Sequence, residues 1–155
     1  MKQIVLIFSL LLAIDHGIVQ ACTSIIIAGR ATPDGRPIMW KNRDTDSYQN
    51  AIKYFDDGKY KSIGLIDADD PAGHAVWIGY NSAGFSIMNT ASYNLIQKDT
   101  IDLKDQEGIL MREALKQCAT VDEFGMFLKN HSKPLGVEAN FGVIDANGGA
   151  AYFEV

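Results

Sequence analysis

Short apolar runs and alternating positions dominate the first two thirds of the chain, a pattern that is typical of strands. The β-branched run from Thr23 to Gly29 predicts a buried strand, and residues 37–41 predict a second one after the turn at residues 33–35. Further strands are expected at residues 60–66, 75–80 and 85–90. Because short turns separate these segments, antiparallel pairing is expected throughout.

After Asp99 the pattern changes to that of helices. Residues 106–118 carry apolar side chains at mixed spacings of three and four, which predicts an amphipathic helix. Thr120 and Glu123 have the spacing of a capping box, and they predict a second helix that ends near Asn130.

The last part of the sequence predicts a hairpin. Its strands are expected at residues 140–145 and 150–155, joined by an Ala-Asn-Gly-Gly turn. The order of strands, two helices and strands indicates an α+β fold. The second strand runs into Val155 without a capping turn or a polar tail, so we expect the N-terminal part of a longer domain.

The first 21 residues predict a cleavable secretion signal. Lys2 precedes an uncharged run from Ile4 to Ile14, and Ala21 is the small residue that a signal peptidase requires. The run is shorter than the roughly 20 apolar residues of a membrane span. Cleavage would leave Cys22 at the amino terminus of one domain, residues 22–155, in a secreted or periplasmic protein without stable membrane insertion.

The composition is that of a globular protein, with 47% hydrophobic and 21% charged residues. The formal net charge is -5, and removing Lys2 and Asp15 with the leader does not change it. Nucleic acids and anionic lipids favour basic faces, so this balance argues against both as partners. Two cysteines, Cys22 and Cys118, are too few for a disulfide scaffold, and no ligand spacing indicates a metal; no cofactor is expected.

A cysteine at a free amino terminus carries its own base. A thiol is a good nucleophile only as thiolate, and at its ordinary pKa of about 8.5 a few per cent is ionised at neutral pH. The α-amine of the same residue, with a pKa of about 7.7 to 8.0, is matched to accepting that proton. Cys22 is therefore a candidate nucleophile, and neither His74 nor His131 lies in a motif that suggests a Cys–His pair.

The charged cluster Lys41-Asn42-Arg43-Asp44 follows the second predicted strand and offers groups that could orient the amine and the thiolate. Residues two apart share a face of a strand, so Lys41 and Arg43 are expected to point together, opposite to Asn42 and Asp44. A carboxylate that accepts from the α-ammonium would hold it, and Asp44 is the candidate. From spacing alone, a solvated charge cluster in a loop is an equal alternative.

Five segments of the chain carry a family resemblance. They are Cys22 to Ile27, Ala31 to Gly35, Lys41 to Asp44, Asn81 to Asn89, and Asn140 to Asp145 with Gly148, Gly149 and Glu154. Together they resemble the cysteine-type N-terminal nucleophile (Ntn) hydrolases, most of all the choloylglycine hydrolase and penicillin acylase group that cleaves linear amides. The resemblance implies the αββα sandwich of that superfamily, of which this chain would supply the N-terminal half.

The resemblance also implies roles for single residues. Cys22 would be nucleophile and, through its amine, base; Asp44 would hold the amine, and Asn89 would lend a backbone N–H to the oxyanion hole. Lys41 stands where the family has arginine, which keeps the charge without the planar fork, so thiolate stabilisation is expected from Lys41 before Arg43. The expected substrate contacts are Arg43, Asn81 and Asn94.

The expected reaction is hydrolysis of a small acyl amide through a thioester on Cys22, exposed by signal peptidase or by autoprocessing. An Ntn dipeptidase is one alternative. An inactive fragment is another, because a further oxyanion-hole asparagine and a late arginine of the family lie beyond the last hairpin, and losing one oxyanion donor typically lowers the rate about 10²- to 10³-fold. The third is a lipid-anchored binding or structural module, because residues 18–22 partly fit a lipoprotein signal in which Cys22 is lipidated.

Other chemistry-bearing residues have structural interpretations. Cys118 lies on the apolar stripe of the first predicted helix and is expected in the core. Trp77 belongs to a strand pattern, which favours packing. Asp67, Asp69 and Asp70 lack the later glycine and glutamate of a calcium loop, so a solvated turn is expected there.

Overall fold

The computed structural model describes residues 22–92, 106–131, 135, 137 and 139–155 of the chain. The predicted leader and Asn94 therefore lie outside the described residues. The elements, in chain order, are β1 (Thr23–Ile27), the 3-10 helix η1 (Gly29–Ala31), β2 (Ile38–Asn42), β3 (Asn50–Phe55), β4 (Ser62–Asp67), β5 (Ile78–Asn81), β6 (Ser86–Ala91), α2 (Glu107–Gln117), α3 (Val121–Asn130), β7 (Ala139–Ile144) and β8 (Ala150–Glu154).

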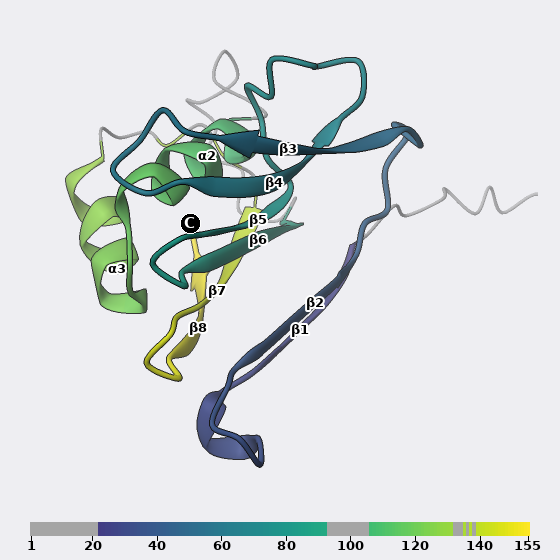
Figure 1. Ribbon diagram of the computed structural model, residues 1–155. Helices are drawn as coiled ribbons and strands as arrows, with labels where there is room; N and C mark the ends of the chain where they lie inside the picture. The colour runs from purple at the N-terminus through teal and green to yellow at the C-terminus, as the bar shows by residue number, and fades with distance from the viewer. Residues whose placement is uncertain (1–21, 93–105, 132–134, 136, 138) are drawn as a thin grey trace, which may run out of the picture.

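These elements form three layers (Figure 1). A six-stranded sheet in the order β3-β4-β5-β6-β7-β8 forms the middle layer, and every strand pair in it is antiparallel, as predicted. Helices α2 and α3 cover one face, where they contact β5, β6 and β8. The β1–β2 hairpin lies against the other face and contacts β7 and β8. The described part of the chain is thus an α+β fold, as expected.

The main core lies between the helices and the sheet. Phe124 of α3 is at its centre, with its ring centroid 5.9 Å from those of Phe85 and Phe141 and 5.1 Å from that of Phe153. Phe124 is fully buried, and burying aromatic rings of this size contributes strongly to stability. Since strand residues two apart share a face, Ile87 in this core places Asn89 on the helix-covered side of β6.

The two helices are confirmed, and α3 has the predicted cap. The Thr120 hydroxyl accepts a hydrogen bond from the Glu123 backbone N–H at 3.1 Å, while the Glu123 carboxylate accepts from the Ala119 N–H at 2.6 Å. The return bond thus reaches one residue further back than in a standard capping box. Among the described residues, no helix is long and apolar enough to span a membrane.

Strand β3 was not predicted, and β5 is shorter than predicted. Strand β3 lies at the edge of the sheet, and its exposed face carries Ile52 and Tyr54. Apolar residues therefore lie on both faces of this strand, and its sequence lacks the apolar–polar alternation that marks a half-buried strand. Before β5, the Val76 N–H donates to the carbonyl of Gly108 in α2 and not to a neighbouring strand, so β5 begins only at Ile78.

The far end of the β1–β2 hairpin is anchored to the β7–β8 turn. The Gly29 N–H donates to the Gly148 carbonyl at 3.1 Å. A side chain at Gly29 would overlap the backbone of Gly35 and Gly148, so the close approach requires glycine. The opposite end of the hairpin, which begins at Cys22, is thereby held at a fixed place on the sheet.

Candidate active site

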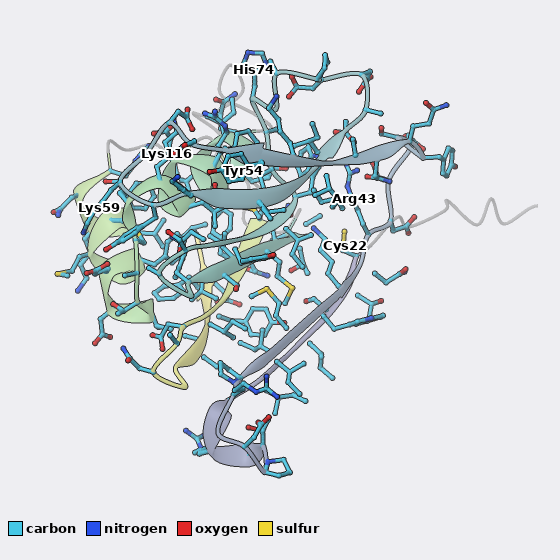
Figure 2. All side chains as sticks on the ribbon, in the orientation of Figure 1. Cys22, Arg43, Tyr54, Lys59, His74 and Lys116 are labelled. Atoms are coloured by element: carbon cyan, nitrogen blue, oxygen red, sulfur yellow. The ribbon has the colours of Figure 1, made fainter. Side chains whose placement is uncertain are left out.

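Cys22 lies at the open end of the hairpin, directly before β1. The register pairs Thr23 with Asn42, so Cys22 falls opposite Arg43 in the segment after β2. Its Sγ is 3.8 Å from the backbone oxygen of Asp44. Figure 2 shows Cys22 and Arg43 close together where the hairpin meets the six-stranded sheet. The hairpin therefore brings the predicted nucleophile next to the charged cluster, as the sequence suggested.

Lys41 connects the hairpin to the sheet at this point. Its Nζ donates to Asn89 Oδ1 at 2.7 Å and to the Trp77 backbone oxygen at 3.0 Å. Burial is the largest influence on its pKa and lowers it to about 8, assisted by the positive charge of Arg43 and opposed by the charges of Cys22 and Glu107. Lys41 is thus a largely buried cation that interacts electrostatically with the candidate nucleophile.

Asn89 and Asp44, the other two predicted catalytic residues, also lie at this end of the hairpin. Asn89 is 6% exposed, and its side-chain oxygen is the acceptor for Lys41. Asp44 is exposed and contributes its backbone oxygen to the surroundings of the thiol. In the full chain the Cys22 nitrogen belongs to a peptide bond, so the predicted contact of Asp44 with an α-ammonium, like the oxyanion N–H of Asn89, stays a prediction for the processed protein.

Arg43 points to the same side as Lys41, as the alternation predicted. Its Nη1 donates to Asp67 Oδ1 at 2.7 Å and also to the side-chain oxygen of Asn50. Its guanidinium lies 4.7 Å from the centre of the Trp77 ring, and its side chain is 11% exposed. Protein groups therefore hold Arg43 on several sides, which favours an internal role over the predicted substrate contact.

Asn81, a predicted substrate contact, lies inside the protein, where its side chain bonds backbone groups. Asn81 is 3% exposed, and its amide nitrogen donates to the backbone oxygens of Leu115 and Cys118, at 2.9 and 2.8 Å. Its amide oxygen accepts from the backbone N–H groups of Ala83 and Phe85. An asparagine amide has two hydrogens and two lone pairs, and all four are used. Asn81 ties β5 to the end of α2, where backbone oxygens lack helical partners.

The interpretation of Asp67 as part of a solvated turn is wrong, because Asp67 ends β4 and its carboxylate is bonded by protein groups. Its carboxylate accepts hydrogen bonds from Arg43 Nη1 and from Trp77 Nε1, each at 2.7 Å, and its side chain is 18% exposed. Burial raises the pKa of Asp67, but the hydrogen bonds from Arg43 and Trp77 outweigh that effect, so its pKa lies below the ordinary value. Sequence spacing holds no signal for this, because Asp67 and Arg43 are 24 positions apart.

Two further residues have the structural places that the sequence predicted. His74 is exposed, its ring nitrogen bonds Asp70 at 2.8 Å, and it lies apart from Cys22 in Figure 2. Cys118 is 2% exposed within the helix–sheet core, and burial raises the pKa of its thiol to about 12. Among the described residues, no three His, Cys, Asp or Glu side chains gather as metal ligands do.

A pocket of about 540 Å³ opens beside Cys22, between the start of β1 and the adjoining ends of β6, β7 and β8. This volume is within the usual range for small-molecule sites. The polar side chains on its wall are Thr23, Ser24, Thr90, Asn140, Tyr152 and Glu154. The Ser24 and Tyr152 hydroxyls hydrogen-bond at 2.9 Å and close the wall between hairpin and sheet. None of these is predicted as a site residue from the sequence, although Thr23, Ser24, Asn140 and Glu154 belong to matching segments.

The α+β fold, with two helices and antiparallel sheets, is compatible with part of an Ntn-type enzyme. The family model described as acyl-coenzyme A:6-aminopenicillanic acid acyl-transferase matches residues 30–155. The chain belongs to this family, which is of the choloylglycine hydrolase and Ntn hydrolase type, so the resemblance found in the sequence is confirmed.

The family is one of enzymes that transfer or hydrolyse acyl groups. Lys41, Asp44 and Asn89 lie within the matched range, whereas Cys22 precedes it. No curated protein and no solved structure was found to match the chain.

Proposed function

We propose that the chain belongs to an exported amidohydrolase in which Cys22, freed by removal of residues 1–21, attacks linear, non-peptide amides. The observation that carries this proposal is the arrangement around one thiol: Cys22 Sγ lies 3.8 Å from the backbone oxygen of Asp44, and Lys41 of the adjoining strand β2 is hydrogen-bonded to Asn89 of β6. Three separate elements thus contribute to one site. Membership of an acyl-transferring family supports the same class of chemistry.

The proposed first half-reaction forms a thioester. The α-amine of Cys22 takes the thiol proton, and the thiolate attacks the carbonyl carbon of the amide. When the tetrahedral intermediate collapses, the C–N bond breaks and the α-ammonium gives its proton to the departing amine. The acyl group then remains on Cys22 Sγ.

The second half-reaction releases the acyl group. The same α-amine takes a proton from water, the hydroxide oxygen bonds the acyl carbon, and the C–S bond breaks. The ammonium returns its proton to the thiolate, so the carboxylic acid leaves and Cys22 is restored. No separate base is required, which agrees with the distance of His74 from the site.

The surrounding residues have distinct proposed roles. The Lys41 ammonium stabilises negative charge on Cys22 and on the tetrahedral intermediate. The Asp44 carboxylate holds the α-ammonium after processing, and an Asn89 N–H contributes to the oxyanion hole. The pocket beside Cys22 receives the substrate, and hydroxyl, amide and carboxylate groups on its wall suit the polar amine portion of an acyl amide better than a hydrocarbon chain.

Acyl transfer is the second candidate. In it an amine rather than water attacks the thioester, and a new amide forms. The description of the matching family as an acyl-transferase favours this version, and the first half-reaction is unchanged. Product analysis with and without added amine separates the two.

The experiment uses the chain with its leader, or a longer parent, expressed in a secreting host. Purified protein is incubated with a panel of acyl amides, and release of amine and acid is measured for wild type, Cys22→Ser and Cys118→Ser. We expect turnover in wild type and Cys118→Ser but not in Cys22→Ser. Equal turnover in all three would reject Cys22 as nucleophile, and a lipid mass on residue 22 would establish the membrane-tethered alternative instead.

A further inference from the structure

We propose that Asp67 is a positioning residue that holds Arg43 and Trp77 and thereby fixes the ammonium of Lys41 against Asn89, beside the hairpin end that carries Cys22. The catalytic meaning of this arrangement rests on the proposed function. The arrangement itself can be tested without any turnover.

Asp67 is the centre of a compact set of contacts. One carboxylate oxygen accepts from Arg43 Nη1 and the other from Trp77 Nε1, each at 2.7 Å. The Arg43 guanidinium also lies over the Trp77 ring, 4.7 Å from its centre. The three side chains therefore contact one another in pairs, and Asp67 is the member that hydrogen-bonds both of the others.

The backbone oxygen of Trp77 connects this set of contacts to Lys41, because it accepts a hydrogen bond from Lys41 Nζ at 3.0 Å. The Trp77 N–H donates to the Leu65 oxygen at 2.9 Å, so the residue is held by its ring on one side and by its backbone on the other. Because the acceptor for Lys41 is part of this fixed residue, the position of the ammonium depends on the contacts of the Trp77 ring.

The direction of the ammonium is restricted as a result. A lysine ammonium has three N–H donors, and two of those of Lys41 are used by Trp77 and Asn89. At most one donor is left for a thiolate or a substrate oxygen. Fixing two acceptors fixes where that third donor points, which is the preorganisation that electrostatic catalysis requires.

Asp67 also balances charge. Lys41 and Arg43 are two positions apart on the same side of the chain, and the positive charge of Arg43 lowers the pKa of Lys41, in the same direction as burial. The charges of Cys22 and Glu107 raise it. Asp67 is paired with Arg43 and compensates its charge, so removing the carboxylate would leave an excess positive charge close to Lys41.

Substitutions of the two members of the Asp67–Arg43 ion pair should shift the pKa of Lys41 in opposite directions. Removing the negative charge in Asp67→Asn disfavours the Lys41 ammonium, and removing the positive charge in Arg43→Gln favours it. A purely structural role of the pair would not produce shifts of opposite sign, since both substitutions break the same contact.

The experiment follows the titration of Lys41 by NMR, using protein labelled with ¹³C and ¹⁵N in its lysines and Lys41→Arg to assign the signal. The wild-type midpoint is expected at about 8, against 10.5 for an ordinary lysine. We expect Asp67→Asn to lower the midpoint by at least about half a pH unit, Arg43→Gln to raise it, and Asp67→Glu to restore most of the wild-type value.

A matched control is Asp57→Asn, which removes another aspartate–arginine pair, with Arg112 at 2.8 Å on the helix-covered side. It should leave the Lys41 midpoint unchanged. An unchanged midpoint in folded Asp67→Asn, or a downward shift in Arg43→Gln, would overturn the proposal. If Asp67→Asn does not fold, Asp67→Ser is measured in its place, and an unchanged Lys41 midpoint in that variant overturns the proposal.

Turnover of acyl amides is measured beside the titration. We expect the alkaline limb of kcat/KM to move with the Lys41 midpoint in each variant. If wild type has no turnover, the proposed function fails while the NMR result still decides the role of Asp67. If turnover is present but its alkaline limb stays fixed while the midpoint moves, Asp67 positions Lys41 without serving catalysis, and the catalytic part of the inference is rejected.

Discussion

The side chain of Lys41 donates a hydrogen bond to Oδ1 of Asn89 at 2.7 Å, although the two residues are 48 positions apart. The contact joins the end of β2 to the buried side of β6, and it brings together two of the residues that were assigned to one site from the sequence. A buried ammonium needs such acceptors, because without them its desolvation would oppose folding more strongly.

Removing the acceptor on Asn89 should impair the site. Hydrogen bonds to charged groups contribute about 1.5 to 3 kcal/mol, so we expect Asn89→Ala to reduce kcat/KM by about 10- to 100-fold. Steady-state kinetics on an acyl amide turned over by wild type measures the effect. Asn147→Ala, on the exposed β7–β8 turn, is the matched control and should retain wild-type rates. Wild-type rates in Asn89→Ala would remove Asn89 from the mechanism.

The buried charge of Lys41 makes stability depend on pH in a defined window. Its pKa is about 8 in the folded protein and 10.5 ordinarily, so between these values the unfolded chain binds the extra proton and stability rises with pH. Below about pH 8 both states are protonated and burial of the charge opposes folding. Lys41→Met lacks this dependence.

The measurement is urea unfolding of wild type and Lys41→Met at pH 7 and pH 10. Since one pKa unit corresponds to about 1.4 kcal/mol, the free energy of unfolding of wild type should gain up to about 3 kcal/mol relative to the variant. Lys129→Met, in the last turn of α3, is the control and should show no such gain. If the difference in free energy of unfolding between wild type and Lys41→Met is the same at pH 7 and pH 10, the burial of a charged Lys41 is contradicted.

The two cysteines should differ sharply in reactivity. Burial raises the pKa of Cys118 to about 12 and leaves it 2% exposed, whereas Cys22 lies beside an open pocket. Iodoacetamide at pH 8 should therefore label Cys22 in the native protein and both cysteines in urea, as read by peptide mass spectrometry. Comparable native labelling of Cys118 would show that the helix–sheet core is not closed.

Asn81 should matter for stability and not for substrate binding. Asn81→Ala leaves two backbone oxygens and two backbone N–H groups without their partner, so we expect a loss of about 2 to 4 kcal/mol in the free energy of unfolding. KM, measured below the unfolding temperature of the variant, should be unchanged. A raised KM with unchanged stability would restore the substrate contact that the sequence suggested.

Much of the local structure could be predicted because it depends on neighbouring residues. The β1–β2 hairpin follows from two apolar runs and the turn between them, and its pairing alone places Cys22 opposite Arg43. The start of α3 follows from the spacing of Thr120 and Glu123. Both signals lie within a few residues of the structure that they specify.

The parts that could not be predicted depend on distant contacts. Asp67 looks like one acid in a polar turn, and only the fold brings it to Arg43 and Trp77. The matching segment predicts Asn81 as a site residue, whereas its bonds to the end of α2 depend on how the helix packs against the sheet. No spacing along the chain records which surface a polar side chain will meet once the layers assemble.

The most direct test of the central claim is to trap the acyl-enzyme. Natively secreted protein is mixed rapidly with an acyl amide, quenched in acid, and analysed by intact mass and by sequencing of its amino terminus. The account predicts a chain that begins at Cys22 and carries one acyl group there, absent in Cys22→Ser. A chain that begins at another residue, or turnover with the acyl group never found on Cys22, would contradict it.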